Sequence, residues 1–416
     1  MIKKENLISA DQNRQPASSN QKTRDLNVEL LRLFACLMVI AVHIKPLNVQ
    51  DGVLLDAGVL FQTVCAPAVG IFFLISGFFL PKTRSIKKAW LRFLRDIALP
   101  ALLVLAASCM LRGWLHNEAG FLESLRSFRP SEEFPLMLRG ILAFDPALTD
   151  SYSEHLWFVF SYALLMLWLP FIRAIIKKEN AGEKALLLFC GIYGFSMFLA
   201  DAEQLHALPF PIYRPFVPPA ELLYFMLGWL LYRRVEGERK VWQATREQTP
   251  AKQSKELLQA VLPRLVLLLL LFVPMFLLQR RLYVELLSSG ADPNLCNLSY
   301  HYLSWKSLFG VLTALLCTGL LLRLSLPSAP LLQSLIPRLS SFTWPVYLLH
   351  FPLVQKLRGA GFEPWLKHLL HADTVPGVLL YMCLYTIGLF LFCAGLSFGI
   401  RSAKFYIHGL LFRHKA

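Results

Sequence analysis

The stretch VELLRLFACLMVIAVHIK, residues 28–45, decides the fold class of this chain. It is wholly apolar between two of its ionisable groups, Arg32 and His43. Ionisable side chains inside a membrane span are costly, and by default they indicate function. The spacing between these two is about three helical turns, so they should share one face at different depths. Glu29, one turn before Arg32, can pair with it. The stretch is predicted to be a membrane-spanning helix that forms one wall of a site.

The composition excludes a soluble globular protein. Of 416 residues, 56% are hydrophobic and only 17% are charged, which leaves too few polar side chains to cover a single core. Apolar runs of about 20 residues, the length that crosses a bilayer, recur from end to end. The sequence therefore predicts an all-α, polytopic integral membrane protein. Residues 1–24 are polar, show no secretory signal pattern and are predicted to be a disordered cytoplasmic tail.

Ten transmembrane helices are expected, and together they make one membrane domain over residues 25–402. Their approximate limits are 28–45, 58–80, 97–115, 155–176, 185–202, 219–232, 263–279, 303–322, 342–357 and 376–400. A long external loop is expected at about 116–154 and a cytoplasmic loop at about 233–262. A basic cytoplasmic tail, 403–416, follows the last span.

The distribution of Lys and Arg sets the expected orientation. With the N-terminus in the cytoplasm, the inside segments hold about three times as many of these residues as the outside ones. Both termini are therefore predicted to be cytoplasmic, and the formal net charge of +15 needs no nucleic-acid partner. No CxxC pair or His/Cys cluster has metal-ligand spacing. Neither a metal site nor a disulfide framework is predicted.

One basic stretch, PKTRSIKKAWLRFLRD at residues 81–96, has two interpretations. Arg92 and Arg95 are three residues apart and should be neighbours on one helix face. Two guanidinium groups at that place would hold a phosphate or pyrophosphate. Ordinary positive-inside charge explains the same residues, and spacing alone leaves both interpretations open.

Other polar side chains in or beside spans are weaker candidates, each with an ordinary structural explanation. His155 and Trp157 begin the fourth span, where a solvated loop histidine and an interfacial aromatic residue are common. Ser76, in the second span, fits close helix packing better than nucleophilic catalysis, because no strand–turn–helix elbow surrounds it. Tyr347 and His350 are three residues apart in the ninth span, where a histidine serves either function or packing.

Taken together, these motifs resemble the acyltransferase-3 family of bacterial membrane-bound sugar O-acyltransferases. Glu29 and Arg32, with His43 eleven residues after the arginine, are similar to the first-helix signature of that family. Further matches follow in family order: FFLISGF at 72–78, RFLR at 92–95, HLWF at 155–158 and YLLH at 347–350. The chain departs from the family pattern in two ways. Its first-helix acid is glutamate, where the family often has aspartate, and no soluble esterase-like domain follows the last span.

The resemblance implies an acyl-CoA-dependent O-acetyltransferase in the bacterial cytoplasmic (inner) membrane. Such enzymes are taken to use acetyl-CoA, or a longer acyl-CoA, and to modify extracytoplasmic or lipid-linked cell-surface sugars. It implies that Arg92 and Arg95 hold the phosphates of CoA and that Arg32 lies near the inner mouth of the same channel. The thioester would then reach His43 at the outward end of its span.

The chemistry requires a base, because a sugar hydroxyl attacks a thioester poorly until its proton is removed. Histidine has the unperturbed pKa closest to this task. His43 is expected to be either the general base or an acylated intermediate, and the sequence leaves both routes open. Tyr347 and His350 are expected to orient the acceptor or stabilise the oxyanion. His155, Trp157 and Ser76 are weaker candidates for the same role.

Two other classes were compared with this interpretation. A transporter or flippase for a lipid-linked sugar would also carry buried Arg and His. Such folds are often built from repeats, however, and no second copy of the first-helix motif is present. A lipid-linked glycosyltransferase should have acidic catalytic residues in a prominent first external loop. That loop, about 46–57, is short here and contains only Asp51 and Asp56. The acyltransferase is therefore favoured, with acceptor sugar and acyl chain unspecified.

Overall fold

A computed structural model gives the structure of the chain. It describes residues 25–44, 52–143, 153–204, 219–244, 250–288, 305–324, 326 and 329–412. The predicted tail at 1–24, the last part of the long external loop and the final four residues lie outside these ranges.

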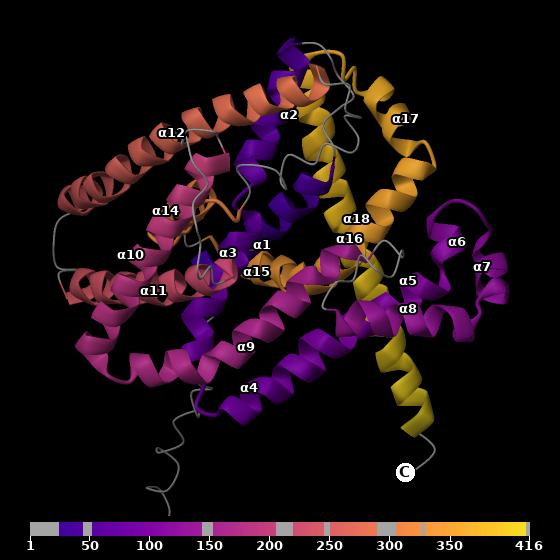
Figure 1. Cartoon of the computed structure of the whole chain (residues 1–416), viewed down its shortest axis with the longest axis horizontal. Coiled ribbons are helices and arrows are strands. Elements are labelled where there is room, and N and C mark those ends of the chain that lie inside the picture. Colours follow the sequence, from indigo (N-terminus) through magenta and orange to yellow (C-terminus); the bar gives the residue numbers. More distant parts are fainter. Residues whose placement is uncertain are drawn as a thin grey trace, which may run out of the picture.

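Every regular element in these ranges is a helix, as the composition predicts (Figure 1). The α-helices are α1 (Leu26–His43), α2 (Gly52–Cys65), α3 (Ala68–Phe79), α4 (Ile86–Phe93), α5 (Leu99–Met110), α6 (Arg112–Leu115), α7 (Phe121–Ser127), α8 (Pro130–Leu142), α9 (Trp157–Ile176), α10 (Glu179–Gln204), α11 (Ala220–Ala244), α12 (Pro250–Ser288), α14 (Leu308–Leu321), α15 (Pro330–Ser340), α16 (Thr343–Gly359), α17 (Phe362–Leu369) and α18 (Val375–Phe412). A π-turn, Leu94–Ala98, joins α4 to α5. A short 3₁₀ turn, Glu154–Leu156, precedes α9.

Seven helical segments of the described residues are long and apolar enough to cross a membrane. They are Leu26–His43, Leu55–Lys82, Ile86–Met110, Glu154–Ile176, Asn180–Ala202, Val261–Glu285 and Val375–Ile400. Each corresponds to one of the expected spans. The other three expected spans fall in α11, α14 and α16, which are helical but shorter or more charged. The count of ten and the cytoplasmic termini therefore stay predictions.

The position of these three helices explains their weaker membrane pattern. Tyr224 and Phe225 of α11 and Val346 of α16 are fully buried among other helices. The outer helices differ, because large apolar side chains such as Leu103 of α5 and Phe171 of α9 are more than 60% exposed. An outward apolar surface suits lipid, whereas an enclosed helix meets mainly protein. Burial is not the whole cause, because the span Leu55–Lys82 is 67% buried and remains strongly apolar.

Glycines bring α3 and α11 into backbone contact at the centre of the bundle. A Cβ atom on Gly77 would overlap the carbonyl oxygen of Phe225, and one on Gly228 would overlap that of Leu74. Only residues without a side chain allow this crossing. Close helix packing, the structural interpretation of the Ser76-Gly77 pair, is confirmed at Gly77.

The segments between spans contain more helix than expected. The region predicted as a long external loop includes α7 and α8. A salt bridge of 2.8 Å between Arg112 Nη2 and Glu133 Oε1 connects α6 to α8. Proline begins both α8 and α12, a position where its missing N–H costs nothing. The predicted cytoplasmic loop is mostly occupied by the end of α11 and the start of α12, and α18 continues into the predicted tail.

Candidate active site

A cavity of about 600 Å³ lies among α1, α3, α4, α9 and α16. This volume is typical of small-molecule sites. The cavity brings together four residues that the sequence singled out: Arg32, Ser76, Arg92 and Tyr347. In Figure 1, α4 lies at one end of the molecule and α17 at the other, with α1 and α16 between them. The cavity therefore extends inward from the end of the molecule at which α4 lies.

Glu29 holds Arg32 in the wall of this cavity. The Glu29 carboxylate is buried and accepts hydrogen bonds from Arg32 Nη1 at 3.2 Å and Ser340 Oγ at 2.5 Å. The Arg32 guanidinium also lies 5.4 Å from the centre of the Phe79 ring. The predicted Glu29–Arg32 pair is thus present. It joins α1 to α15 as well as orienting the arginine.

Arg92 and Arg95 have different surroundings, although three residues separate them. Arg92 lines the cavity, whereas Arg95 does not. The π-turn that starts at Leu94 widens the helix, so the three-residue spacing no longer places the two side chains on one face. Arg95 instead donates two hydrogen bonds, of 2.6 and 3.0 Å, to the carboxylate of Asp96. Asp96 lines the cavity, so Arg95 neutralises an acid at its edge.

Three histidines from distant parts of the chain form one cluster. His43 ends α1, His155 lies in the 3₁₀ turn before α9, and His350 is in the middle of α16. The ring centre of His350 is 5.2 Å from that of His43 and 5.4 Å from that of His155. The Phe351 ring packs against both His43 and His155, at 4.8 and 5.3 Å. His155, the weakest histidine candidate in the sequence, is therefore a full member of the cluster.

Backbone carbonyl groups fix the tautomers of two of these rings. His155 Nε2 lies 3.1 Å from the Leu348 carbonyl oxygen, and His350 Nδ1 lies 2.7 Å from that of Tyr347. Carbonyl oxygens only accept, so these two nitrogens are assigned as N–H donors. The other nitrogens, His155 Nδ1 and His350 Nε2, are buried without a hydrogen-bond partner among the described residues. Each therefore presents an uncommitted lone pair, as a proton acceptor requires.

Tyr347 connects the cavity to the histidines. Its ring lines the cavity, and its hydroxyl donates to the backbone carbonyl of His155. His43 is only half-buried, and Arg358 Nη2 binds its backbone carbonyl at 3.0 Å. The cavity consequently ends next to the cluster, and His43 is the member nearest the opposite surface.

Ser76 and Trp157, two of the predicted site residues, make contacts within the protein that have no catalytic character. Ser76 lines the cavity, but its hydroxyl donates to the Phe72 carbonyl at 2.9 Å in its own helix. Trp157 is not among the cavity-lining residues and stacks on Trp305 at 5.0 Å, beside Lys306. The interpretation of these two residues as packing groups is favoured by these contacts.

Sequence reasoning missed several residues around the cluster. Trp344 lines the cavity and stacks on Tyr347 at 5.4 Å. Its indole Nε1 is buried and has no hydrogen-bond partner in the described ranges. Phe351 separates two of the histidines, and Arg358 binds at the end of α1. The spacing of Trp344, Tyr347 and Phe351, at one helical face, was the available signal.

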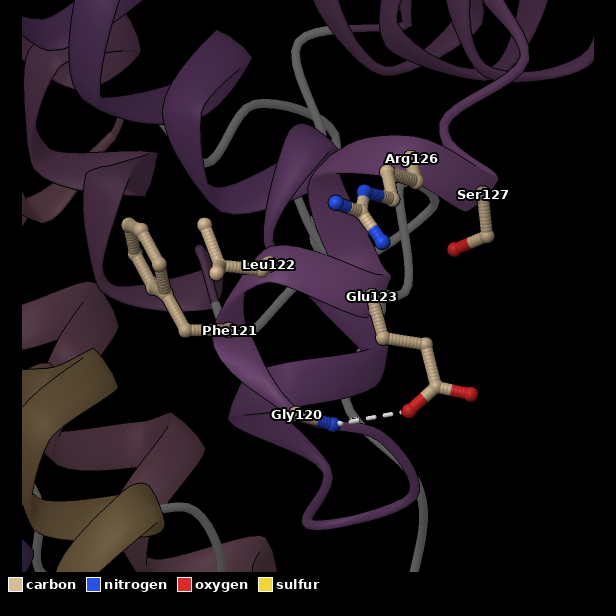
Figure 2. A pocket seen from close by; sticks show the side chains of 6 residues that line it. All are labelled: Gly120, Phe121, Leu122, Glu123, Arg126 and Ser127. Atoms are coloured by element: carbon tan, nitrogen blue, oxygen red, sulfur yellow. Dashed lines mark hydrogen bonds between the residues drawn. The ribbon is translucent and has the colours of Figure 1, made fainter.

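A second pocket is formed by α7 alone, and Figure 2 shows its lining. The Glu123 carboxylate accepts the Gly120 backbone N–H at 3.2 Å, on the other side of the helix from Phe121 and Leu122. This arrangement caps the start of α7. None of the predicted site residues lines this pocket.

Comparison with known proteins identifies the family of this chain. No curated protein and no solved structure matches the chain. A family model described as an acyltransferase domain matches residues 25–398, nearly the whole chain. The match includes α1, which carries Arg32 and His43, and α16, which carries Tyr347 and His350. Together with the apolar helices, it shows that the chain is a multi-pass membrane acyltransferase and belongs to the acyltransferase-3 family.

Proposed function

We propose that this acyltransferase moves an acetyl group from cytoplasmic acetyl-CoA to a hydroxyl of an extracytoplasmic or lipid-linked cell-surface sugar, in the bacterial inner membrane. The observation that carries the proposal is one cavity that joins Arg92 and Arg32 to Tyr347, next to three histidines. An elongated donor with phosphates at one end and a thioester at the other matches that arrangement.

The cavity is suited to CoA along its length. Arg92 supplies a cation for a phosphate at the α4 end, and Glu29 holds Arg32 deeper in the wall. Apolar side chains such as Val39 and Phe72 line the middle, where a pantetheine arm needs little charge. Arg95 contributes indirectly, because its bidentate bond to Asp96 removes a negative charge that would repel phosphate.

His43 acts as the general base in the proposed reaction. Its imidazole takes the proton of the acceptor hydroxyl while the hydroxyl oxygen forms a bond to the thioester carbonyl carbon. The tetrahedral intermediate collapses, the carbon–sulfur bond breaks, and the imidazolium returns the proton to the CoA sulfur. The products are the sugar ester and free CoA. His43 is chosen because it is the half-exposed member of the cluster, whereas His155 and His350 are enclosed.

The neighbouring groups position this base. His350 lies beside His43 with a fixed tautomer, and Phe351 packs against the His43 ring. Tyr347 and Trp344, at the end of the cavity, are placed to contact the acyl end of the donor. The indole N–H of Trp344 has no hydrogen-bond partner in the described part of the chain, so it is a donor available for the thioester oxygen.

The test measures release of free CoA by purified protein in nanodiscs. Acetyl-CoA is supplied with and without a polysaccharide fraction from the cell envelope. Acceptor-dependent release should be lost in His43→Ala, and acetyl-CoA binding should be weakened in Arg92→Ala. Arg129→Ala, which removes an exposed arginine elsewhere, is the matched control. Folded protein that neither binds nor cleaves any acyl-CoA would contradict the proposal.

The same protein distinguishes the two routes at His43. Without acceptor, a general base leaves the protein unmodified, whereas a covalent route leaves an acetyl group on His43. Intact-mass measurement and peptide mapping after incubation with acetyl-CoA report the difference. We expect no adduct.

A further inference from the structure

Two buried tyrosines in α18 have hydroxyl groups that the fold leaves without partners. Tyr381 is fully buried and Tyr385 is 4% exposed, and neither hydroxyl has a hydrogen-bond partner among the described residues. Burying an unpaired hydroxyl costs free energy. Two such groups one helical turn apart therefore indicate a ligand rather than a packing requirement.

Charged groups of α16 and α17 surround these hydroxyls. Glu363 is buried, and Arg358 Nε donates to both of its carboxylate oxygens, at 3.3 and 3.4 Å. Glu363 follows Phe362, whose ring centre lies 5.8 Å from that of Tyr385. The Lys367 ammonium lies 5.5 Å from the centre of the Tyr381 ring. The cluster thus offers a carboxylate acceptor and hydroxyl donors, with two cations against one anion.

Aromatic rings adjoin the same cluster. The Phe362 ring is 5.8 Å from that of Tyr385 and 5.4 Å from that of Trp365, and the Trp365 side chain is exposed. Apolar rings beside a carboxylate and hydroxyls suit a ligand with an apolar face and several hydroxyl groups.

The cluster is attached directly to the catalytic histidine. Arg358 binds Glu363 through Nε and the His43 carbonyl oxygen through Nη2, at 3.0 Å. A ligand bound at Tyr381 and Tyr385 would therefore be linked through Arg358 to the backbone at the end of α1, which carries His43.

We infer that Arg358, Glu363, Tyr381 and Tyr385 form the subsite for the acceptor, and that it takes a polyhydroxylated sugar ring. The inference rests on the proposed function and extends it to the acceptor side. The Tyr381 and Tyr385 hydroxyls bond to the sugar, Glu363 accepts one of its hydroxyl protons in a hydrogen bond, and the aromatic rings cover its apolar face.

The short helix α17 gives the sugar access to this subsite. Gly361, before α17, and His371, just after it, both have positive φ angles, 75° and 48°. Among neighbouring helices, α17 contacts α16 and α18. A short helix between two left-handed residues moves without breaking a long helix, which opens the hydroxyls beneath it. In Figure 1, α17 lies at the end of the molecule opposite α4.

The test separates acceptor binding from folding. Tyr381→Phe/Tyr385→Phe removes only the two unpaired hydroxyls, so the melting temperature should stay equal or rise. Acceptor-dependent CoA release is measured with acetyl-CoA and an oligosaccharide fraction from the cell envelope. The double variant should raise the acceptor KM by at least about tenfold and leave acetyl-CoA affinity unchanged. Tyr193→Phe, a buried tyrosine of α10, is the matched control and should leave KM unchanged.

Each other outcome is decisive. An unchanged acceptor KM in an active double variant overturns the subsite and shows that the hydroxyls serve water or packing only. Wild-type protein that binds acetyl-CoA but shows no acceptor-dependent release overturns the sugar acceptor, and the subsite with it. Failure of wild-type protein to bind acetyl-CoA refutes the donor half of the proposed function instead. Glu363→Gln, which keeps the shape of the side chain, should also raise KM.

Discussion

The imidazole rings of His43 and His350 lie 5.2 Å apart, although one ends the first helix and the other is in the middle of α16. Their planes are inclined by 46°, and Phe351 closes one side of the pair. The contact makes the end of α1 depend on α16. It also gives the two histidines separable roles, because His350 is anchored to carbonyl groups of its own helix and His43 is not.

Replacing His43 by alanine should remove the base without disturbing the donor cavity. We expect kcat to fall by about 10²–10⁴, the usual contribution of a general base, with acetyl-CoA affinity unchanged. His350→Ala should lower kcat less, because it displaces the base rather than deleting it. Steady-state CoA release and equilibrium binding of acetyl-CoA check both. His116→Ala is the control, and equal loss of donor binding in His43→Ala would point to a structural role.

Arg95 and Asp96 should behave as a coupled pair. Arg95→Ala leaves the Asp96 carboxylate uncompensated at the edge of the cavity, so acetyl-CoA affinity should fall about tenfold. Arg95→Ala/Asp96→Ala should recover most of that affinity, because the repelling charge is also gone. Isothermal titration with acetyl-CoA gives the double-mutant cycle. If the double variant binds as weakly as Arg95→Ala, the arginine contacts the phosphates itself.

Glu29 should be required for the position of Arg32. In Glu29→Gln the amide cannot accept from both Arg32 and Ser340 with the strength of a carboxylate. We expect acetyl-CoA affinity to drop about tenfold and the melting temperature to fall. Glu29→Asp keeps the charge and should lose less. Binding isotherms and thermal unfolding in nanodiscs measure the two effects; an unaltered affinity in Glu29→Gln would refute this role.

The crossing of α3 and α11 should not tolerate a methyl group. Gly77→Ala or Gly228→Ala places a Cβ atom against a backbone carbonyl, which cannot move as a side chain can. The expected destabilisation is about 1–3 kcal/mol. Gly191→Ala in α10 is the matched control, because open space surrounds its Cβ position, and it should gain up to about 1 kcal/mol. Thermal unfolding ranks the three variants, and equal effects would exclude the contact as the cause.

A charge network on α11 should make stability depend on pH. Burial raises the pKa of Glu238, but hydrogen bonds and charge from Arg323 and then Arg234 outweigh it, and the net pKa lies below the ordinary 4.5. A carboxyl group whose pKa is lower in the folded than in the unfolded protein stabilises the fold at a pH above the unfolded-state pKa. This stabilisation is lost as the pH falls through the folded-state pKa. Glu238→Gln should therefore lower the melting temperature near pH 7, and this effect should shrink as the pH falls below the ordinary value of 4.5. Because the pair is partly exposed, high salt should reduce the difference.

The sequence predicts some parts of the site well because they are local. The Glu29–Arg32 pair and the shared face of Tyr347 and His350 depend only on helical spacing, and both are found. The sequence could not predict that Arg92 and Arg95 face different surroundings. The π-turn changes the backbone hydrogen-bond pattern after Phe93, and no residue type in this segment signals such a turn. The place of His155 depends on how α9 packs against α16, which no single segment specifies.

The hydropathy pattern identifies seven of the ten expected spans in the described ranges. It measures how well a helix tolerates lipid, and it is weaker in α11, α14 and α16, which are shorter or more charged. In contrast, α1, which carries Arg32 and His43, has the hydropathy of a span. The fold class was predictable from composition, whereas the count of ten spans stays a prediction.

Tyr347 has a consequence for the membrane as a barrier. A water-accessible cavity that enters a bilayer from one side shortens the distance that ions must cross. Tyr347 closes the inner end of that cavity with its ring, and its hydroxyl ties α16 to the backbone before α9. The side chain that ends the donor cavity is thereby also an insulator. A small residue at this position should therefore make the enzyme a leak, whatever its effect on turnover.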